Sequence, residues 1–360
     1  MHGLPNISQH GAASVAAQKV SSAGTAPRLE DYAERIHAVL GPLVAVGASV
    51  ALFDFPNYPN VGDSAIRLGQ EIYLRSKLRA RIVHVDDCTA VGRPFPALPE
   101  AVVILIHGGG NLGDLYPHHQ ILREKLIERY PHHRIIQLPQ SIHFLDARNE
   151  EQCRRVFGSH RDFHLLVRDH ESLKLGQRLH HGPTRLSPDM ALCLGRLGRS
   201  AEPRHPIVGL LRTDEEQASA GFCPVRENRL IATDLLNEPS TLTQRLTGRV
   251  DRWLRTFLRS LAPLSRLKRQ LYHHLAHEQL KRGRDILGSG QVVITDRLHG
   301  HILCILMGIS HVALDNSYRK IGNFFDAWNT GAGLCQRAST LNDALDRAND
   351  LLKTLQFGAV

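Results

Sequence analysis

Short apolar runs alternate with amphipathic segments along most of this chain of 360 residues. Residues 101–106 form an uninterrupted apolar run, the pattern of a strand buried on both faces of a parallel sheet. Residues 29–40 instead place apolar side chains at helical spacing. This alternation predicts an α/β protein with parallel, doubly wound sheets. The expected strands are 44–55, 81–85, 101–106, 134–138, 164–167, 207–211, 291–294 and 311–314, and the expected helices include 29–40, 64–77, 118–130 and 341–355.

The length and the punctuation of the chain predict two α/β domains rather than one. A passage rich in Gly, Pro and Arg at 195–206 has the composition of a linker. Residues 226–237 are polar and irregular, and their pattern predicts no element. The expected units are a disordered leader (1–27), an N-terminal domain (28–198), a C-terminal domain (206–340) with a basic helical insertion (241–284), and a C-terminal helix (341–360).

Four cations each follow an expected strand: Arg168, Arg212, Arg297 and Lys320. Any one of them taken alone is most simply a surface charge. At equivalent ends of parallel strands they indicate a cationic pocket facing a cleft between the domains, because guanidinium groups match carboxylates and phosphates.

The segment 294–300 combines an acid, a guanidinium, an imidazole and a glycine directly after a strand. One interpretation is a turn in which Asp296 and Arg297 pair and His299 is an ordinary loop residue. The other is a reactive site, since an imidazole exchanges protons near neutral pH.

Two glycine-containing connections are further candidates for ligand binding. Three glycines, Gly108, Gly109 and Gly110, followed by Asn111, are costly unless the backbone must approach something closely. Asn60 and Asp63 lie in a strand-to-helix connection that is either a simple capped turn or an anion site at a helix N-terminus. Neither segment has a phosphate-loop or dinucleotide-binding pattern.

The net charge is +9, and residues 245–284 carry eleven Lys or Arg but only two acids. Apolar side chains alternate with arginines at 249–261, so this segment is either a core helix with a cationic face or a helix that lies on an anionic membrane surface. No nucleic-acid motif accompanies the charge, so a nucleic-acid partner is not expected.

The other composition features argue for a cytoplasmic protein without a metal. No apolar run is long enough to span a membrane, and residues 1–27 lack the pattern of a signal peptide. The cysteines and histidines lack convincing metal-ligand spacing, and the adjacent histidine pairs are interpreted as surface residues. These cysteines are 88, 153, 193, 223, 304 and 335, and the histidine pairs are 118–119, 132–133, 180–181 and 273–274.

Taken together, the motifs resemble the polysaccharide pyruvyl transferase family over residues 50–330. The matching segments, in order, are 60–63, 106–114, 137–141, 167–172, 187–191 and 295–300. Residues 315–320, which include Asn316, look most like the exopolysaccharide branch of the family.

This resemblance implies two Rossmann-like domains in a glycosyltransferase-B-like arrangement. It also implies transfer of pyruvate from phosphoenolpyruvate onto two hydroxyls of a saccharide as a ketal, with phosphoenolpyruvate as co-substrate and no separate cofactor. Family acceptors are often lipid-linked, which would place the protein at the inner face of the membrane. On this reading His299 moves protons and Arg297 holds the donor. Substrate-binding roles then fall to Arg168, Lys320, Arg212, Asn60, Asp63, Gly108, Gly109, Gly110, Asn111 and Asn316.

Two alternatives keep the same architecture. A nucleotide-sugar glycosyltransferase would need a nucleotide pocket, for which no acidic ribose-binding residue stands in a convincing place. A sugar-binding protein without catalysis is disfavoured because residues 296–299 form a complete set of reactive groups.

Overall fold

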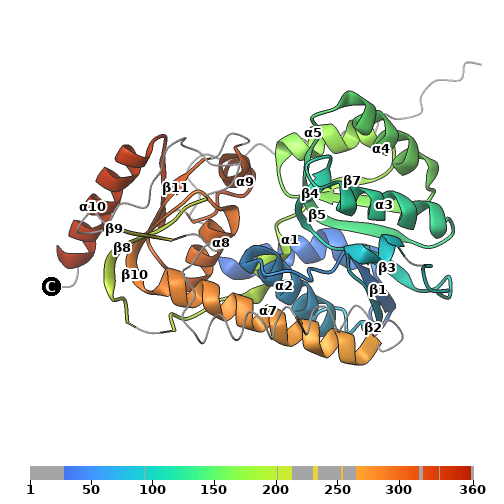
Figure 1. Ribbon diagram of the computed structural model, residues 1–360, viewed down its shortest axis with the longest axis horizontal. Helices are drawn as coiled ribbons and strands as arrows, with labels where there is room; N and C mark the ends of the chain where they lie inside the picture. The colour runs from blue at the N-terminus through green and yellow to red at the C-terminus, as the bar shows by residue number, and fades with distance from the viewer. Residues whose placement is uncertain are drawn as a thin grey trace, which may run out of the picture.

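The computed structural model describes residues 28–92, 94–200, 202–212, 230–233, 253, 265–315, 319–331 and 333–357. The expected leader, most of the stretch 213–264, and Asn316 lie outside these residues. Within them the chain forms two parallel sheets covered by helices (Figure 1), which confirms the expected α/β class.

The first sheet comprises seven strands of the described N-terminal part in the order β2-β1-β3-β5-β6-β7, with β4 paired to β5. Every pairing in it is parallel. The strands are β1 (Ser49–Phe53), β2 (Arg81–Val85), β3 (Val103–Ile106), β4 (Gly109–Gly113), β5 (Ile135–His143), β6 (Phe163–Val167) and β7 (Thr184–Leu186).

The second sheet has five described strands in the order β12-β11-β10-β8-β9, again all parallel. Its most buried strands, β10 and β11, coincide with the apolar runs that predicted them. The strands are β8 (His205–Leu210), β9 (Leu230–Thr233), β10 (Gly290–Thr295), β11 (His311–Leu314) and β12 (Cys335–Ala338).

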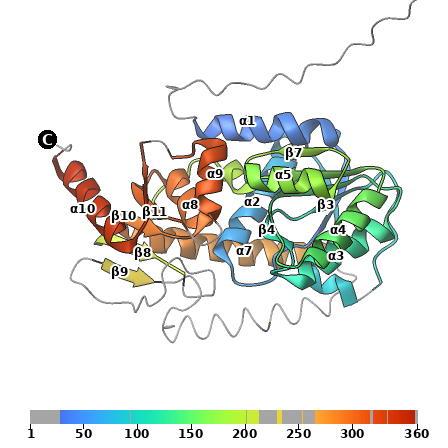
Figure 2. The ribbon, with the colours of Figure 1, turned by 90° about the horizontal axis from the view of Figure 1, so that it is seen from above.

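Helices cover both faces of the sheets. In the first half α3, α4 and a short 3-10 helix pack on one face, and α1 and α2 lie on the other (Figures 1 and 2). In the second half α10 covers one face and α8 the other. The helices are α1 (Leu29–Leu40), α2 (Val61–Ser76), α3 (Pro117–Arg129), α4 (Ala147–Ser159), α5 (His170–Leu179), α7 (Ser265–Gly288), α8 (Leu298–Met307), α9 (Lys320–Trp328) and α10 (Leu341–Phe357), and the 3-10 helices are Gly41–Leu43, Cys88–Gly92 and Met190–Leu194.

One buried apolar cluster joins the two halves. It includes Val61 of α2, Tyr272 of α7 and Leu298 of α8. Helix α7, the described part of the expected basic insertion, runs alongside both halves in Figure 1 and packs against α2 and β2. Because apolar side chains of α7 are buried in the cluster that joins the two halves, this part of the insertion packs between them as part of the core.

Two local expectations were wrong in detail. The first strand is shorter than 44–55, because residues 46 and 47 form a turn with Gly47 at φ +79°, and Asp54 at φ +62° follows the last strand residue. Strand β5 continues through Pro139 rather than ending at residue 138, with its register shifting between Gln137 and Gln140. That irregularity removes the need for a ladder hydrogen bond from the proline, which has no N–H.

Candidate functional site

Arg168, Asp189 and His299 form the centre of the candidate site. Arg168 follows β6 and donates from Nη1 to Oδ2 of Asp189 over 2.7 Å. The Nε2 atom of His299, from α8 of the other half, lies 3.5 Å from the same oxygen. One carboxylate therefore holds a guanidinium from the first sheet and an imidazole from the second.

This carboxylate is fully buried. Burial alone would raise its pKa, but the facing imidazole of His299 and the guanidinium of Arg168 hold the pKa of Asp189 well below its usual range. Asp189 is therefore a fixed negative charge at neutral pH. A fixed anion 3.5 Å from Nε2 of His299 is placed where the acid of a catalytic triad lies, although no hydrogen bond joins the two side chains in this structure.

Arg168 keeps one nitrogen available within the described structure. Its Nε donates to Oγ of Ser141 and its Nη1 to Asp189, while its backbone carbonyl accepts from the indole of Trp328. Its Nη2 has no hydrogen-bond partner among the described residues and lies close to Gly110, where a Cβ would come within 2.9 Å of it. The guanidinium is thus locked in place with a donor directed at the glycine-rich segment.

The N-terminus of α2 borders His299. A Cβ on Gly62 would overlap the imidazole ring, so glycine is what allows the ring to lie there. The side chain of Asn60 accepts from the N–H groups of Gly62 and Asp63 at 2.8 and 3.2 Å. Of the two interpretations of this connection, the structure shows the capped turn, because Asn60 is the N-cap and its side chain occupies the N–H groups that an anion would use.

Residues 109–113 form a strand, β4, rather than the expected loop. The glycines serve close backbone approach, but partly to protein: a Cβ on Gly108 would lie 2.7 Å from the carbonyl oxygen of Pro139 in β5. Gly109 has φ +133° and faces Asp63, which accepts from the hydroxyl of Tyr58 over 2.8 Å. Gly109 and Gly110 therefore border the site, while Gly108 serves strand packing.

A buried polar network supports this segment. The Arg123 guanidinium, fully buried, donates to Asp54 over 3.1 Å and to the carbonyl and side-chain oxygens of Asn111. Gln140 also donates to the Asn111 side chain, over 2.7 Å. His119 contacts the other oxygen of Asp54. Asn111, predicted as substrate-binding, thus has its side chain engaged in holding β4 against β5.

The remaining predicted cations lie on the second half. Arg297 is the N-cap of α8, and its backbone N–H donates to Thr295 Oγ1 over 3.1 Å. Asp296 accepts from the backbone N–H of Arg212 over 2.9 Å, and burial raises the pKa of this carboxyl to about 6. Lys320 is the first residue of α9, whose last residue, Trp328, contacts Arg168. Their roles toward a substrate stay predictions.

Two groups among the described residues have donors that a divalent ion takes. They are Asp54 with Cys88 and His119, and His301 with His311 and Cys335. The Nδ1 atom of His301 and the Nε2 atom of His311 are hydrogen-bonded over 2.9 Å, and burial lowers the pKa of His311 to about 4. The absence of a metal therefore stays a prediction.

The interpretation of the adjacent histidines as surface residues was wrong for two of them. His133 and His180 are buried, and each contacts a backbone carbonyl, that of Leu98 or Phe163. A ring with one N–H satisfied by a carbonyl packs like an apolar group, which the sequence pattern does not reveal.

Sequence reasoning missed Asp189 as a site residue. It follows β7, a strand of only three residues, and lies in the segment Ser187-Pro188-Asp189. A carboxylate directly after a strand of the same sheet as Arg168 was the available signal.

Within this α/β fold a buried acid, an imidazole and a guanidinium meet near the ends of parallel strands, an arrangement suited to binding an anion and moving protons. Residues 60–318 match the polysaccharide pyruvyl transferase family. The chain belongs to this family, as its motifs had indicated, and is therefore a pyruvyl transferase that acts on polysaccharide.

Individual relatives agree. The chain is 32% identical over 318 residues to pyruvyl transferase 1 of Schizosaccharomyces pombe, covering 84% of this chain and 75% of that protein. It is 30% identical to the putative pyruvyl transferase EpsO of Bacillus subtilis, covering 77% and 84%. An uncharacterized protein from Klebsiella pneumoniae has a similar fold, with a TM-score of 0.56 at 16% identity, covering 86% of this chain and 99% of that one.

None of the described helices combines the length with the apolar character that crossing a bilayer requires.

Proposed function

We propose that the protein transfers pyruvate from phosphoenolpyruvate to two hydroxyls of a saccharide as a ketal, with release of phosphate. The observation that carries this proposal is the Arg168–Asp189–His299 arrangement. A guanidinium with a free donor suits the carboxylate or phosphate of the donor, and an oriented imidazole suits the proton transfers.

The proposed reaction needs only one side chain that transfers protons. The enol methylene of phosphoenolpyruvate takes a proton, one sugar hydroxyl adds to C2, phosphate leaves C2, and the second hydroxyl adds in its place. The two hydroxyls give up two protons, of which one goes to the methyl carbon and one leaves with phosphate. His299 is suited to move these protons because the fixed charge of Asp189 faces its ring.

We further propose that the substrates meet between the two halves, in a glycosyltransferase-B-like arrangement. Arg297, Arg212 and Lys320 would approach the donor from the second half, and Arg168 from the first. Asp63 and the Gly109–Gly110 backbone suit sugar hydroxyls better than an anion, because Asp63 is itself a carboxylate beside Gly109. Asn316 keeps its proposed substrate-binding role.

The test is incubation of the full chain with labelled phosphoenolpyruvate and a panel of nitrophenyl glycosides and lipid-linked saccharides. The expected result is phosphate release matched by an acceptor mass gain of one pyruvate ketal. The variant His299→Ala is expected to lose transfer while keeping its unfolding temperature. His274→Ala, which removes an exposed histidine of α7, is the matched control.

A nucleotide-sugar glycosyltransferase would instead release a nucleotide from a sugar nucleotide and leave phosphoenolpyruvate untouched. That outcome, or full activity of His299→Ala, would refute the proposal.

A further inference from the structure

A pocket lined by three arginines lies at the opposite end of α2 from the candidate site. Its lining residues are Arg75, Ala80, Arg81, Ile82 and Arg269, and its volume is about 470 Å³. Gly62, beside His299, and Arg75 stand near the two ends of α2, so the helix separates the two places by about 20 Å. The pocket is therefore distinct from the Arg168–Asp189–His299 site.

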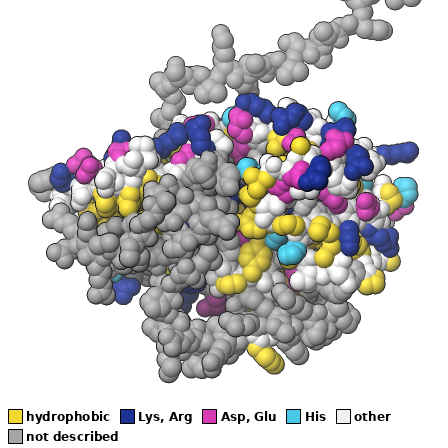
Figure 3. All heavy atoms as spheres, turned by 45° about the horizontal axis from the view of Figure 1, so that its top comes forward, with side chains coloured by type: hydrophobic (Ala, Val, Ile, Leu, Met, Phe, Trp, Pro, Cys, Tyr) yellow, Lys and Arg dark blue, Asp and Glu magenta, His cyan; other side chains and the backbone are white. Residues whose placement is uncertain are grey.

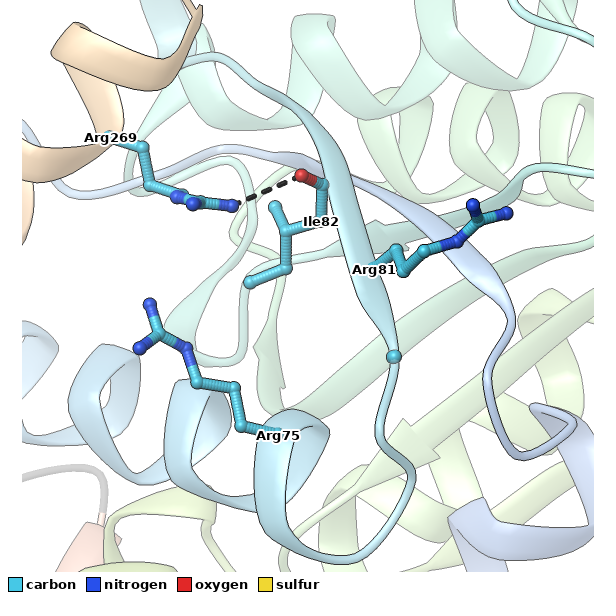
Figure 4. A pocket seen from close by; sticks show the side chains of 5 residues that line it. Arg75, Arg81, Ile82 and Arg269 are labelled. Carbon is cyan, nitrogen blue, oxygen red and sulfur yellow. Dashed lines mark hydrogen bonds between the residues drawn. The ribbon is translucent and has the colours of Figure 1, made fainter.

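The arginines come from three different elements. Arg75 extends from the last turn of α2 and Arg269 from α7, and Figure 4 shows both beside Ile82 of β2. Arg81 starts β2 and extends along the other side of the strand, where its Nη2 donates to Ser49 Oγ over 3.0 Å. Arg75 and Arg269 thus supply the guanidinium groups of the pocket, whereas the guanidinium of Arg81 extends away from it.

The side chain of Arg269 is held by a backbone carbonyl of the edge strand β2. Because β2 is the last strand of its sheet, its outward carbonyls lack a strand partner. The Nη1 atom of Arg269 donates to the carbonyl of Ile82 over 3.1 Å. This single bond positions the guanidinium and leaves its other nitrogens without partners among the described residues.

Positive charge in the pocket exceeds the negative charge around it. Within the described structure Arg81 and Arg269 contact only neutral acceptors. Arg75 lies 3.5 Å from Glu71, but that buried carboxylate also pairs with Arg67 at 3.0 Å and with His273 at 2.7 Å. A shared carboxylate cannot neutralise every cation near it, so the pocket attracts an anion.

We propose that Arg75 and Arg269 bind a phosphate or diphosphate group. Forked guanidinium donors match phosphate oxygens, and two of them converging on one space provide more than one charge-assisted hydrogen bond. On the face shown in Figure 3, in contrast, Lys and Arg are interspersed with Asp and Glu over the described surface. The proposal does not depend on the reaction proposed above.

The test measures binding of pyrophosphate to the full chain by calorimetry in the presence of saturating phosphoenolpyruvate, so that the donor site does not contribute. The double variant Arg75→Gln with Arg269→Gln is expected to bind at least tenfold more weakly. Arg178→Gln is the matched control, because Arg178 is also an exposed arginine 3.5 Å from a glutamate, Glu150, but lies on α5. If the double variant unfolds at a lower temperature than the native protein, Arg75→Gln alone replaces it.

A second arm identifies the source of the phosphate. Vesicles of phosphatidylcholine with or without phosphatidic acid are mixed with the same proteins and floated. Arginine-dependent flotation with phosphatidic acid indicates a lipid-borne phosphate, and arginine-dependent binding of pyrophosphate alone indicates a soluble one. Binding of both probes that is unchanged in the arginine variants, or no binding of either, overturns the proposal. Transfer activity is measured separately, so that a failure of the proposed reaction is distinguishable.

Discussion

Asp189 is the residue through which the two halves of the site depend on each other. It accepts from Arg168 and faces His299, and it is fully buried. A pocket whose arginines only bind an anionic substrate would not need this carboxylate. An imidazole that must present one nitrogen to a substrate does need a partner at its other nitrogen. In the proposed reaction, Asp189 would therefore position both the guanidinium that binds the donor and the imidazole that moves protons.

The variant Asp189→Asn tests this role. It keeps the side-chain shape but removes the charge, so we expect kcat to fall by about 100-fold, because a general acid or base that loses its orientation loses an effect of that order. The KM for phosphoenolpyruvate should rise as well, since Arg168 loses its partner. Steady-state kinetics measure both. Asp162→Asn, which weakens a half-exposed pair with Arg134, should change neither constant.

Gly62 provides a second test at the residue scale. A Cβ at this position overlaps His299, while the helix itself tolerates alanine, so Gly62→Ala should displace the imidazole and reduce kcat by at least tenfold with little loss of stability. Gly158→Ala is the control, because nothing lies within 4 Å of a Cβ there. It should stabilise α4 by about 0.5–1 kcal/mol and leave kcat unchanged. Normal kinetics in Gly62→Ala would show that His299 does not need its present position.

At the scale of elements, most of the glycine-rich segment is strand β4, which pairs with β5. Their contact is held by the network of Arg123, Asp54 and Asn111, which is buried without water-facing atoms on the guanidinium. Such a network confers a unique register only while every member is satisfied.

Arg123→Met should therefore be strongly destabilising. Removing the guanidinium takes the arginine charge away from the buried Asp54 and leaves only His119 and Asn111 beside it, at a cost of about 3–5 kcal/mol in the free energy of unfolding. Urea denaturation measures it. Arg134→Met removes an arginine that pairs with Asp162 at 3.0 Å with both side chains about 40% exposed, and should cost at most about 1 kcal/mol. Equal losses in the two variants would contradict a structural role for the buried network.

The elements that could be predicted from the sequence are those with an unambiguous local pattern. The apolar runs at 101–106, 291–294 and 311–314 match β3, β10 and β11 closely, because a strand buried on both faces needs apolar residues throughout. Strand β4 was missed because consecutive glycines disfavour a strand unless a neighbouring backbone approaches closely, and that neighbour, β5, is remote in the sequence.

The same distinction applies to the candidate site. Arg168 and His299 were predicted because each stands at a strand end within a recognisable motif. The place of Asp189 in the site becomes evident from its contacts with Arg168 and His299, which lie on two other elements. The side chain of Asn60 accepts from the N–H groups that the anion-site interpretation had left for a ligand. Long-range contacts of this kind leave no periodic trace in the sequence.

At the scale of the whole molecule, the halves share a core and several polar contacts. Trp328 of α9 donates to the carbonyl of Arg168 over 2.8 Å, and accepts at its own carbonyl from Tyr32 of α1 over 3.3 Å. Helix α7 adds Tyr272, which donates to Asp87 and stacks on Phe55. These contacts join the second half to the first, so the spacing of Arg168 and His299 depends on the integrity of the whole fold.

Buried histidines predict how the stability of this fold depends on pH. Burial lowers the pKa of His107 and of His311 to about 4, and that of His301 well below its usual value. In the unfolded chain these rings titrate near 6.5, so below that pH the unfolded state binds more protons and stability falls. At pH 5 His107 and His311 each cost about 2 kcal/mol relative to pH 7, and His301 acts in the same direction.

One acid acts in the opposite direction. The pKa of Asp296, raised to about 6, makes the folded state take up a proton between pH 7 and 5, which offsets about 1 kcal/mol. The three histidines outweigh it, so the midpoint of urea denaturation should fall markedly from pH 7 to pH 5. His107→Gln should reduce the loss in the free energy of unfolding between pH 7 and pH 5 by about 2 kcal/mol, because the amide does not titrate. His274→Gln, on the exposed face of α7, should leave it unchanged. A midpoint that is constant or rises on acidification would mean that these rings are charged in the folded protein, against their burial.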